Sequence, residues 1–578
     1  MNRYEKKSRL PLVGALSLAL CIVTVFCWTV SAPAAEPLPA IADLSREESL
    51  RLGEQLYRNG LLSSGKPVTA IVQGDNEVEG TMFSCESCHM RSGLGSYEGG
   101  VLTTPTNGAI LYSSQFNVRQ PTAAQLKTIP AYLLPLYQAP PRRPAYTDET
   151  LAVALRDGID PTGRAFHGVM PRYLLDDREM ALLINYLKNL SPEFSPGVTK
   201  TTLRFATVVT ENVRKEEREA MLTPLESYVR GRNSKAKTFE SRVKYGFYAE
   251  WMDLAYRRLE LDIWELKGPP ETWRSQLEEY YRKGPVFALL GGITNGTWKP
   301  VHDFSEAQRI PCLLPITDDP VISETDWYTL YFSKGFYQEG EAAARFLGST
   351  KNLQADMNVL QIFRETGEGR ALSAGFQETW QKLGHKPPVN RILRAGETIT
   401  TDFLQQLAAA EKPAAILLWV GPEAVRLLEG IPANANLPDM LFLSATMLEQ
   451  KLKSLPEPLR DITYITYPYA LPADKVARQQ LKPAKDAQLI SDRKIARKMN
   501  ALALLLTDSL MMMRENFYRE RFFEVIDMFQ DRPQPYSGDY YRFSFGPGQR
   551  YAAKGCYIVQ LTHGTAPELV KKSEWVIH

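Results

Sequence analysis

The sequence contains one CxxCH run, Cys85-Glu86-Ser87-Cys88-His89, which constrains the fold more than any other feature. Two thiols at this spacing can add to the two vinyl groups of one porphyrin, and the histidine that follows then lies beneath the iron. A redox dithiol would need a βαβ context, and a zinc site would need further ligands at metal spacing. Neither surrounds Cys85, so the run predicts one covalent c-type haem attached to Cys85 and Cys88, with His89 as iron ligand.

The N-terminus has the three parts of an export signal. Basic residues precede an apolar stretch from Leu12 to Val30, and Ala32 and Ala34 fit the rule for a cleavage site. We therefore expect residues 1–34 to be a signal peptide, cleaved near Ala34, and the mature protein to be periplasmic. The alternative is an N-terminal membrane anchor, because the apolar stretch is long enough to span a bilayer.

Composition excludes several functions. The net charge is +2 with acidic and basic residues interspersed, so we expect no nucleic-acid partner. A chain of 578 residues exceeds one ordinary core and predicts two or three domains. No nucleophile–base constellation is apparent, which favours an electron-transfer or binding protein over an enzyme.

Cys312 and Cys556 lie in apolar runs and are expected as two buried thiols, with a disulfide as the alternative.

Two helices are expected to enclose the haem. The first covers 45–59 and begins with Ser45 and Glu48 as a capping box. The second is capped by Asp176 and has apolar residues at helical spacing. Residues 60–80 are expected to be a polar insertion. The chain after His89 is rich in glycine and proline and has no period of its own, which is typical of loops that surround an apolar body such as haem.

The iron of an electron-transfer site usually takes a sixth ligand. Met170 is the first candidate, because a loop presents its thioether and Pro171 stiffens the chain after it. His167 would give bis-histidine ligation instead, and an open iron is the third alternative.

These motifs together resemble a class I mono-haem cytochrome c. The resemblance covers about residues 45–192 and rests on the first helix, the CxxCH run and the Met170-Pro171 segment before the last helix. It implies an all-α cytochrome c domain over residues 35–192 that performs one-electron transfer. It also implies that the carbonyl of Pro105 holds His89.

A linker at 193–200 separates this region from one of different character, residues 201–578. Strand-like runs there alternate with helical patterns, which predicts parallel sheets in two successive α/β lobes. A long apolar helix at 495–517 is expected between the lobes, and a terminal hairpin is expected from 540–545 and 556–561. The expected strands are 203–209, 259–266, 286–291, 310–316, 327–332, 358–363, 392–393, 415–420 and 440–443.

The second region resembles a type I periplasmic solute-binding protein of the branched-chain amino-acid receptor kind. The resemblance rests on the glycine-rich segment 290–297, the strand and loop 310–317 and the segment 340–346. It implies a small-molecule ligand between the lobes. Segment 443–446 lacks an acidic residue where the family places one, so the ligand need not be an α-amino acid. Trp419 could instead pack in the hydrophobic core. The implied ligand residues are Asn295, Thr297 and Thr317 in the near lobe and Arg364, Thr366, Trp419 and Glu423 in the far lobe.

The combined prediction is a multidomain protein that carries one covalent haem c for one-electron transfer and couples it to a solute-binding domain. Its expected partners are a redox protein, either a dehydrogenase or another cytochrome, and a small-molecule solute. Two alternatives stay open. One is a solute receptor of a membrane transporter or sensor, with the haem as redox reporter. The other is a haem oxidoreductase that acts on the bound solute.

Overall fold

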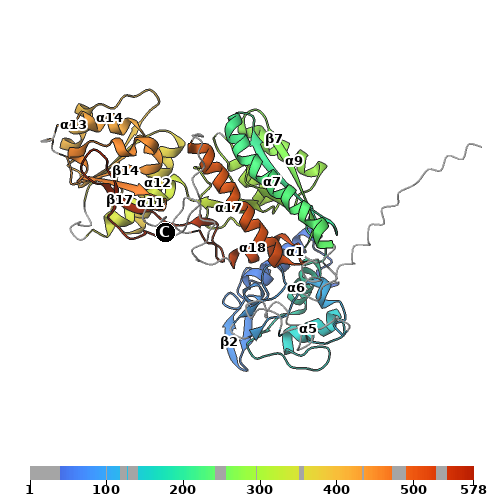
Figure 1. Ribbon diagram of the computed structural model, residues 1–578. Helices are drawn as coiled ribbons and strands as arrows, with labels where there is room; N and C mark the ends of the chain where they lie inside the picture. The colour runs from blue at the N-terminus through green and yellow to red at the C-terminus, as the bar shows by residue number, and fades with distance from the viewer. Residues whose placement is uncertain are drawn as a thin grey trace, which may run out of the picture.

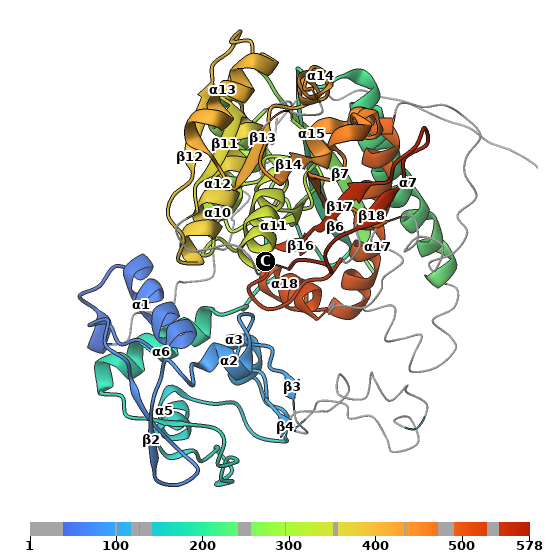
Figure 2. The same ribbon diagram turned by 90° about the vertical axis from the view of Figure 1, so that its left-hand side faces the viewer.

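The computed structural model describes residues 39–98, 101–116, 127, 141–240, 256–294, 296–350, 357–432, 435, 437–471, 490–528 and 543–577. The expected signal peptide, residues 1–34, lies outside these ranges. Figures 1 and 2 show three bodies: an N-terminal domain and two α/β lobes. Within the described ranges, no helix combines the length and the apolar character that a membrane span requires.

The N-terminal domain is built around the packing of its first and last long helices. Ser45 caps α1 by accepting a hydrogen bond from the amide of Glu48, and Asp176 caps α6 in the same way through Glu179, as the sequence predicts. Gly53 allows the two helices to approach closely, because a Cβ there would lie 2.4 Å from the Leu182 carbonyl oxygen. The helices are α1 (Arg46–Asn59), α2 (Cys85–His89), α3 (Gly108–Leu111), α5 (Asp148–Asp157) and α6 (Asp177–Asn189).

This domain also contains strands, which the sequence analysis did not predict. The expected polar insertion at 60–80 forms an antiparallel hairpin, and its first strand also pairs with a short strand after Met170. The first hairpin strand is a short run, Thr-Ala-Ile-Val, and the second, Asn-Glu-Val-Glu, is mostly polar, so neither is long enough to show a clear alternation of apolar residues. The strands are β1 (Thr69–Val72), β2 (Asn76–Glu79) and β5 (Arg172–Tyr173) in one sheet, and β3 (Tyr97–Glu98) with β4 (Val101–Leu102) in another.

Lobe 1 is a six-stranded sheet in the order β16-β10-β9-β8-β6-β7, with helices on both faces. Side chains of α7, α17 and α18 share one apolar core with the sheet, and those of α9 and α10 share the core of the opposite face. The strands are β6 (Thr202–Thr210), β7 (Arg258–Leu266), β8 (Ala288–Leu290), β9 (Cys312–Leu313), β10 (Thr329–Ser333) and β16 (Tyr551–Ala553). The helices are α7 (Lys215–Glu240), α9 (Trp273–Lys283), α10 (Lys299–Ala307), α17 (Ile490–Met513) and α18 (Arg519–Asp527).

Lobe 2 is a seven-stranded sheet in the order β12-β11-β13-β14-β15-β17-β18. Its first five strands are parallel, and β17 and β18 are antiparallel additions at one edge. The strands are β11 (Val359–Arg364), β12 (Val389–Leu393), β13 (Ala415–Trp419), β14 (Met440–Ser444), β15 (Thr463–Tyr467), β17 (Tyr557–Leu561) and β18 (Leu569–Lys571). The helices are α11 (Phe336–Gly348), α12 (Gly367–Lys382), α13 (Thr401–Glu411), α14 (Glu423–Glu429) and α15 (Ala445–Leu448). Two sheets in succession confirm the prediction of two α/β lobes.

Three details differ from or refine the sequence-based expectations. Helix α17 does not lie between the lobes: its apolar face packs on the sheet of lobe 1. The glycine-rich turn after Phe545 returns to β16, where the Ser544 amide donates to the Ala552 carbonyl, whereas β17 pairs with β15 and β18. Cys312 and Cys556 are free thiols buried in the cores of different lobes, as expected.

Candidate functional site

The CxxCH run borders a largely apolar cavity of about 300 Å³ inside the N-terminal domain, which we call the CxxCH cavity. Helix α2 supplies one wall, and the loop of residues 101–106, helices α3 and α5 and the segment 164–173 supply the others. All four residues predicted to hold a haem line this one cavity: Cys85, Cys88, His89 and Met170.

His89 presents one ring nitrogen to the protein and leaves the other without a partner. Its Nδ1 lies 2.8 Å from the carbonyl oxygen of Thr104, and since a carbonyl only accepts, Nδ1 carries the proton. Nε2 is buried and has no hydrogen-bond partner. Burial lowers the pKa of His89 to about 4, against the opposing effect of the Thr104 bond, so the imidazole is neutral at physiological pH. The expectation that the Pro105 carbonyl holds His89 is wrong: the carbonyl is that of the preceding residue.

The two cysteines are not set up as a reactive dithiol. Both are free, and burial raises the pKa of the Cys85 thiol to about 11, although a hydrogen bond with Tyr173 acts in the opposite direction. Redox-active CxxC pairs need a lowered thiol pKa in a polar environment. The Tyr173 hydroxyl donates to the Phe83 carbonyl at 2.7 Å, which ties β5 to the start of the CxxCH run.

Met170 and His167 both border the cavity, in different environments. Met170 is half-buried and packs against the core of the domain, and Arg172 donates to its carbonyl oxygen. His167 is exposed, and its Nδ1 accepts from the Val169 amide at 3.3 Å. A thioether that rests on the core is better placed to be a fixed ligand than an exposed ring.

Two arginines give the same cavity positive charge. Arg143 is buried and donates to the carbonyls of Ile110, Leu111 and Pro144. Arg164 is exposed and pairs with Asp160 at 2.9 Å. Within the described residues, no group of three or more His, Cys, Asp and Glu side chains is arranged to hold a metal ion.

In lobe 1, hydroxyl groups gather where neighbouring parallel strands end. The bridges Val209–Ile293 and Ile293–Ile316 place the loops after β6, β8 and β9 side by side. The Thr210 hydroxyl lies 3.3 Å from that of Thr294, and Thr317 follows Ile316 directly. Ligands of open α/β sheets bind at such carboxyl ends of strands.

The other two residues predicted to bind ligand in the near lobe are Thr297 and Asn295. Thr297 accepts from the Lys299 amide at 3.1 Å and borders a shallow hollow lined by residues of α9, α10 and the turn before α9. Asn295 lies outside the described residues.

In lobe 2, the predicted ligand residues are largely occupied with one another or with the core. Arg364 forms a two-pronged ion pair with Glu423, with Nη2 2.7 Å from Oε2, and also donates to the Glu397 carbonyl. Trp419 is fully buried and donates from Nε1 to Gln361 Oε1 at 3.2 Å. Trp419 therefore belongs to the core, and the Arg364–Glu423 pair stabilises the strand ends.

The two lobes approach each other at the loops after β9 and β11. Thr317 accepts from the Asp319 amide, and Thr366 caps α12. A Cβ at Gly367 would lie 3.5 Å from Oδ2 of Asp319, so these loops face each other across the lobes. Burial, and then the nearby carboxylate of Glu368, raise the pKa of Asp319.

Sequence reasoning missed several residues of these sites, among them Asp319, Thr210 and Thr104. Thr210 is the last residue of β6, and Asp319 lies in the loop after β9; both are positions near a strand end that could have been searched for polar side chains. Thr104 acts through its carbonyl oxygen, which its side chain does not reveal.

Comparison with known proteins bears on the lobes. Residues 253–492 match the sequence profile of the Periplasmic binding protein family. No curated protein matches the chain. Among solved structures, a fatty acid ABC transporter substrate-binding protein from Thermomonospora curvata is 16% identical with a TM-score of 0.41, over 67% of this chain and 95% of that one. A putative branched-chain amino acid ABC transporter from Rhodospirillum rubrum is 15% identical with a TM-score of 0.43, over 64% and 100%.

The profile covers β7 to the start of α17, and thus strands of both lobes. Together with the two successive α/β sheets, the match identifies the second part of the chain as a two-lobed domain of the periplasmic-binding-protein type.

Proposed function

We propose that the protein is an exported c-type cytochrome fused to a solute receptor, with one covalent haem in the CxxCH cavity for one-electron transfer. The observation that carries this proposal is the state of His89. Its Nδ1–H is held by a backbone carbonyl, and its buried Nε2 lacks a partner beside two free cysteines. A histidine iron ligand requires these same features, because the bond at one nitrogen fixes the tautomer and orients the other.

The residues that border the cavity fit a haem in composition as well. Cys85 and Cys88 would hold it by thioether bonds, and His89 and Met170 would bind its iron. Arg143 and Arg164 would face its two carboxylates. A bound haem supplies an iron that takes up and releases one electron, and methionine ligation raises its reduction potential. The apolar walls of the cavity would exclude water from the iron.

The lobes are proposed to bind a small polar solute between the loops that follow β9 and β11. The hydroxyls of Thr294 and Thr317, which follow the ends of neighbouring strands, can donate hydrogen bonds to carboxylate or hydroxyl oxygens of a solute. A receptor of this fold is exported, which agrees with the expected signal peptide and a periplasmic location. The proposed partners are a redox protein, which exchanges electrons with the haem, and a membrane transporter or sensor, which contacts the lobes.

The test begins with the optical spectrum of protein purified from the periplasm. Covalent haem should stay with the chain in acid acetone, and wild type should show the oxidised band of sulfur–iron ligation, which Met170→Ala should abolish. His167→Ala is the matched control and should leave that band intact. Haem lost to acid acetone would overturn the cytochrome proposal. A spectrum altered by His167→Ala and indifferent to Met170→Ala would replace Met170 by His167.

The solute proposal is tested separately by thermal-shift screening of the holoprotein against carboxylates, amino acids and small alcohols. Any compound that raises the melting temperature of wild type should lose affinity in Thr317→Val. The control Thr272→Val removes an exposed hydroxyl on lobe 1. Equal affinity in both variants would exclude Thr317 from the site.

A further inference from the structure

Two neighbouring strands of lobe 1 lead directly into lobe 2. Strands β10 and β16 are parallel partners, with Tyr331 opposite Tyr551 and Ser333 opposite Ala553. The chain leaves β10 for α11 through Lys334–Gly335, and leaves β16 for β17 through Lys554–Gly555. A hydrogen-bonded pair of strands is stiff along its length, about 3.3 Å per residue. A displacement at one end of this pair is therefore carried to the other end.

The end toward lobe 2 has the geometry of a hinge. Gly335 and Gly555 both adopt positive φ, at 59° and 114°. The buried side chain of Gln338 bridges the two crossings: its Nε2 donates to the Gly555 carbonyl at 3.2 Å, and its Oε1 accepts from the Lys334 amide at 3.2 Å. The two crossings are thus tied together and bend as one.

The opposite end of the strand pair meets the N-terminal domain. Trp327, two residues before β10, lies between two guanidinium groups. Cζ of Arg91, from the N-terminal domain, is 3.9 Å from the centre of its ring, and Cζ of Arg550, next to β16, is 3.8 Å from it. Arg550 is held in turn by Asp527 of α18 at 3.0 Å. Both strands therefore begin on a stack that includes a residue of the other domain.

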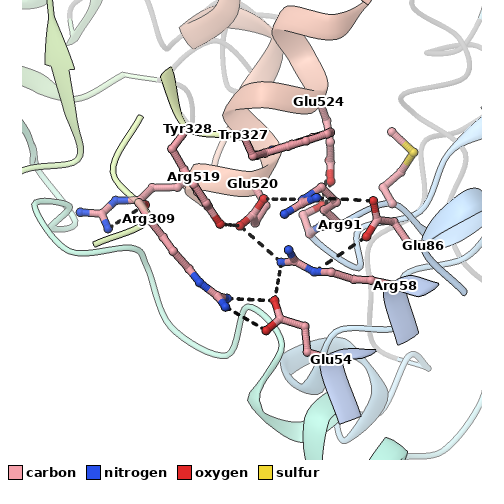
Figure 3. A network of polar contacts seen from close by, with 12 residues as sticks. Glu54, Arg58, Glu86, Arg91, Arg309, Trp327, Tyr328, Arg519, Glu520 and Glu524 are labelled. Carbon is pink, nitrogen blue, oxygen red and sulfur yellow. Dashed lines mark hydrogen bonds and ion pairs between the residues drawn. The ribbon is translucent and has the colours of Figure 1, made fainter. Parts of the chain in front are cut away.

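The same residues belong to a network of charges that extends into the CxxCH run (Figure 3). Glu520 of α18 accepts from Tyr328 at 2.5 Å and pairs with Arg91 at 3.1 Å and Arg58 at 3.5 Å. Each of these arginines also lies 3.8 Å from Glu86, which stands between the two cysteines. Burial opposes the charge on Glu520, yet the two arginines hold the pKa of its carboxyl below the usual value.

The junction is reinforced by bonds on both sides of this network. Glu524 accepts from the Ser92 amide at 2.7 Å and from its hydroxyl at 2.8 Å, and Arg309 pairs with Glu54 through two contacts of 2.9 Å. The N-terminal domain is therefore fixed on lobe 1, and closure of the lobes is left to the crossings.

We propose that β10 and β16 couple the hinge to the haem. Closure of lobe 2 shifts the Arg91–Trp327–Arg550 stack and thereby moves charged groups around Glu86. The altered electrostatic potential then changes the reduction potential of the haem. This proposal rests on the proposed function and specifies its regulation. By linkage, the coupling is reciprocal, so reduction of the haem changes the affinity of the lobes for their solute. The protein would then be a receptor that responds both to binding of a solute and to reduction of its haem by one electron.

A double-mutant cycle tests the coupling without knowledge of the solute. The readout is the midpoint potential, measured by passing one electron per haem from an electrode. Gln338→Met breaks the bridge between the crossings, and Trp327→Leu removes the stack. We expect Gln338→Met to shift the midpoint potential when it is introduced into the wild-type protein. Introduced into the Trp327→Leu variant, the same substitution should leave the midpoint potential unchanged. The control Gln406→Met, on the exposed face of α13 in lobe 2, should shift neither.

Hydrogen exchange of the unaltered protein provides a second test that does not depend on how the variants fold. Amides of residues 334–341 and 554–557 should exchange at different rates in oxidised and dithionite-reduced protein, while those of α9 stay the same. Additive potential shifts, or exchange rates independent of haem oxidation state, would overturn the coupling and leave the cytochrome proposal intact. Absence of covalent haem in wild type would overturn both.

Discussion

The Nδ1 atom of His89 lies 2.8 Å from the carbonyl oxygen of Thr104, fifteen residues further along the chain. Gly95, whose amide donates to the carbonyl of His89 at 3.0 Å, lies directly against Thr103 in the loop that carries this carbonyl. The orientation of the imidazole thus depends on a loop that has no regular secondary structure.

Gly95→Ala should disturb this loop and reduce haem loading. Gly95 has a φ of 77°, and a Cβ there would lie only 2.1 Å from the Thr103 carbonyl oxygen. Gly65→Ala is a matched control, because Gly65 has a φ of 80° and no atom lies within 4 Å of its Cβ position. Both variants lose about 1 kcal/mol of stability to backbone strain. Only Gly95→Ala should also lower the ratio of haem absorbance to protein; an equal loss in both would contradict the role of the loop.

Glu520→Gln should raise the midpoint potential of the proposed haem. The substitution removes a negative charge and leaves Arg58 and Arg91 less compensated next to Glu86. Added positive charge near the iron disfavours its oxidised form, which carries one positive charge more than the reduced form. Voltammetry of both variants measures the shift, and Glu77→Gln is the control because its exposed charge is screened by solvent. A lower potential in Glu520→Gln would contradict the assignment.

Arg519→Lys should destabilise the attachment of α18 to the rest of lobe 1. Arg519 is buried and donates to four carbonyl oxygens, those of Val286, Phe287, Gln308 and Arg309. A lysine ammonium cannot reach all four, and buried carbonyls without partners cost about 3 kcal/mol or more in total. Urea unfolding should show this loss. Arg274→Lys, in an exposed pair with Glu278, should change stability by less than about 0.5 kcal/mol.

Local signals in the sequence were sufficient for much of the fold. The caps Ser45 and Asp176 mark helix starts through side chains that bond their own third amide, and apolar runs mark buried parallel strands such as β6 and β13. Each of these signals depends on residues close together in the chain.

The parts that were not predicted depend on partners far away in the chain. Strand β16 is three residues long and exists because β10, some two hundred residues earlier, pairs with it. The apolar character of α17 predicts burial, but not which sheet covers it. The same limit applies to the candidate site. The CxxCH run is recognisable from the sequence alone, whereas the role of Glu520 becomes visible only because the fold places it next to Arg91.

Glu339 should make the stability of lobe 2 depend on pH. This carboxyl, in the first turn of α11, is fully buried; Oε2 accepts from the Thr466 hydroxyl at 2.7 Å and Oε1 has no partner. Burial raises its pKa to about 7, although hydroxyl groups of Thr446, Thr466 and Ser444 act in the opposite direction. The unfolded chain ionises near the ordinary value of 4.5.

Between these two values the folded state binds the proton and the unfolded state does not. The contribution of Glu339 to the free energy of unfolding should therefore be highest below pH 4.5. It should fall as the pH rises and level off above pH 7. The total loss is about 3 kcal/mol, at about 1.4 kcal/mol per pKa unit. Urea titrations of lobe 2 at several pH values measure it. Glu339→Gln should remove this slope, because the amide does not ionise, whereas Glu429→Gln, on the exposed side of α14, should retain it. A slope that persists in Glu339→Gln would assign the proton to another group.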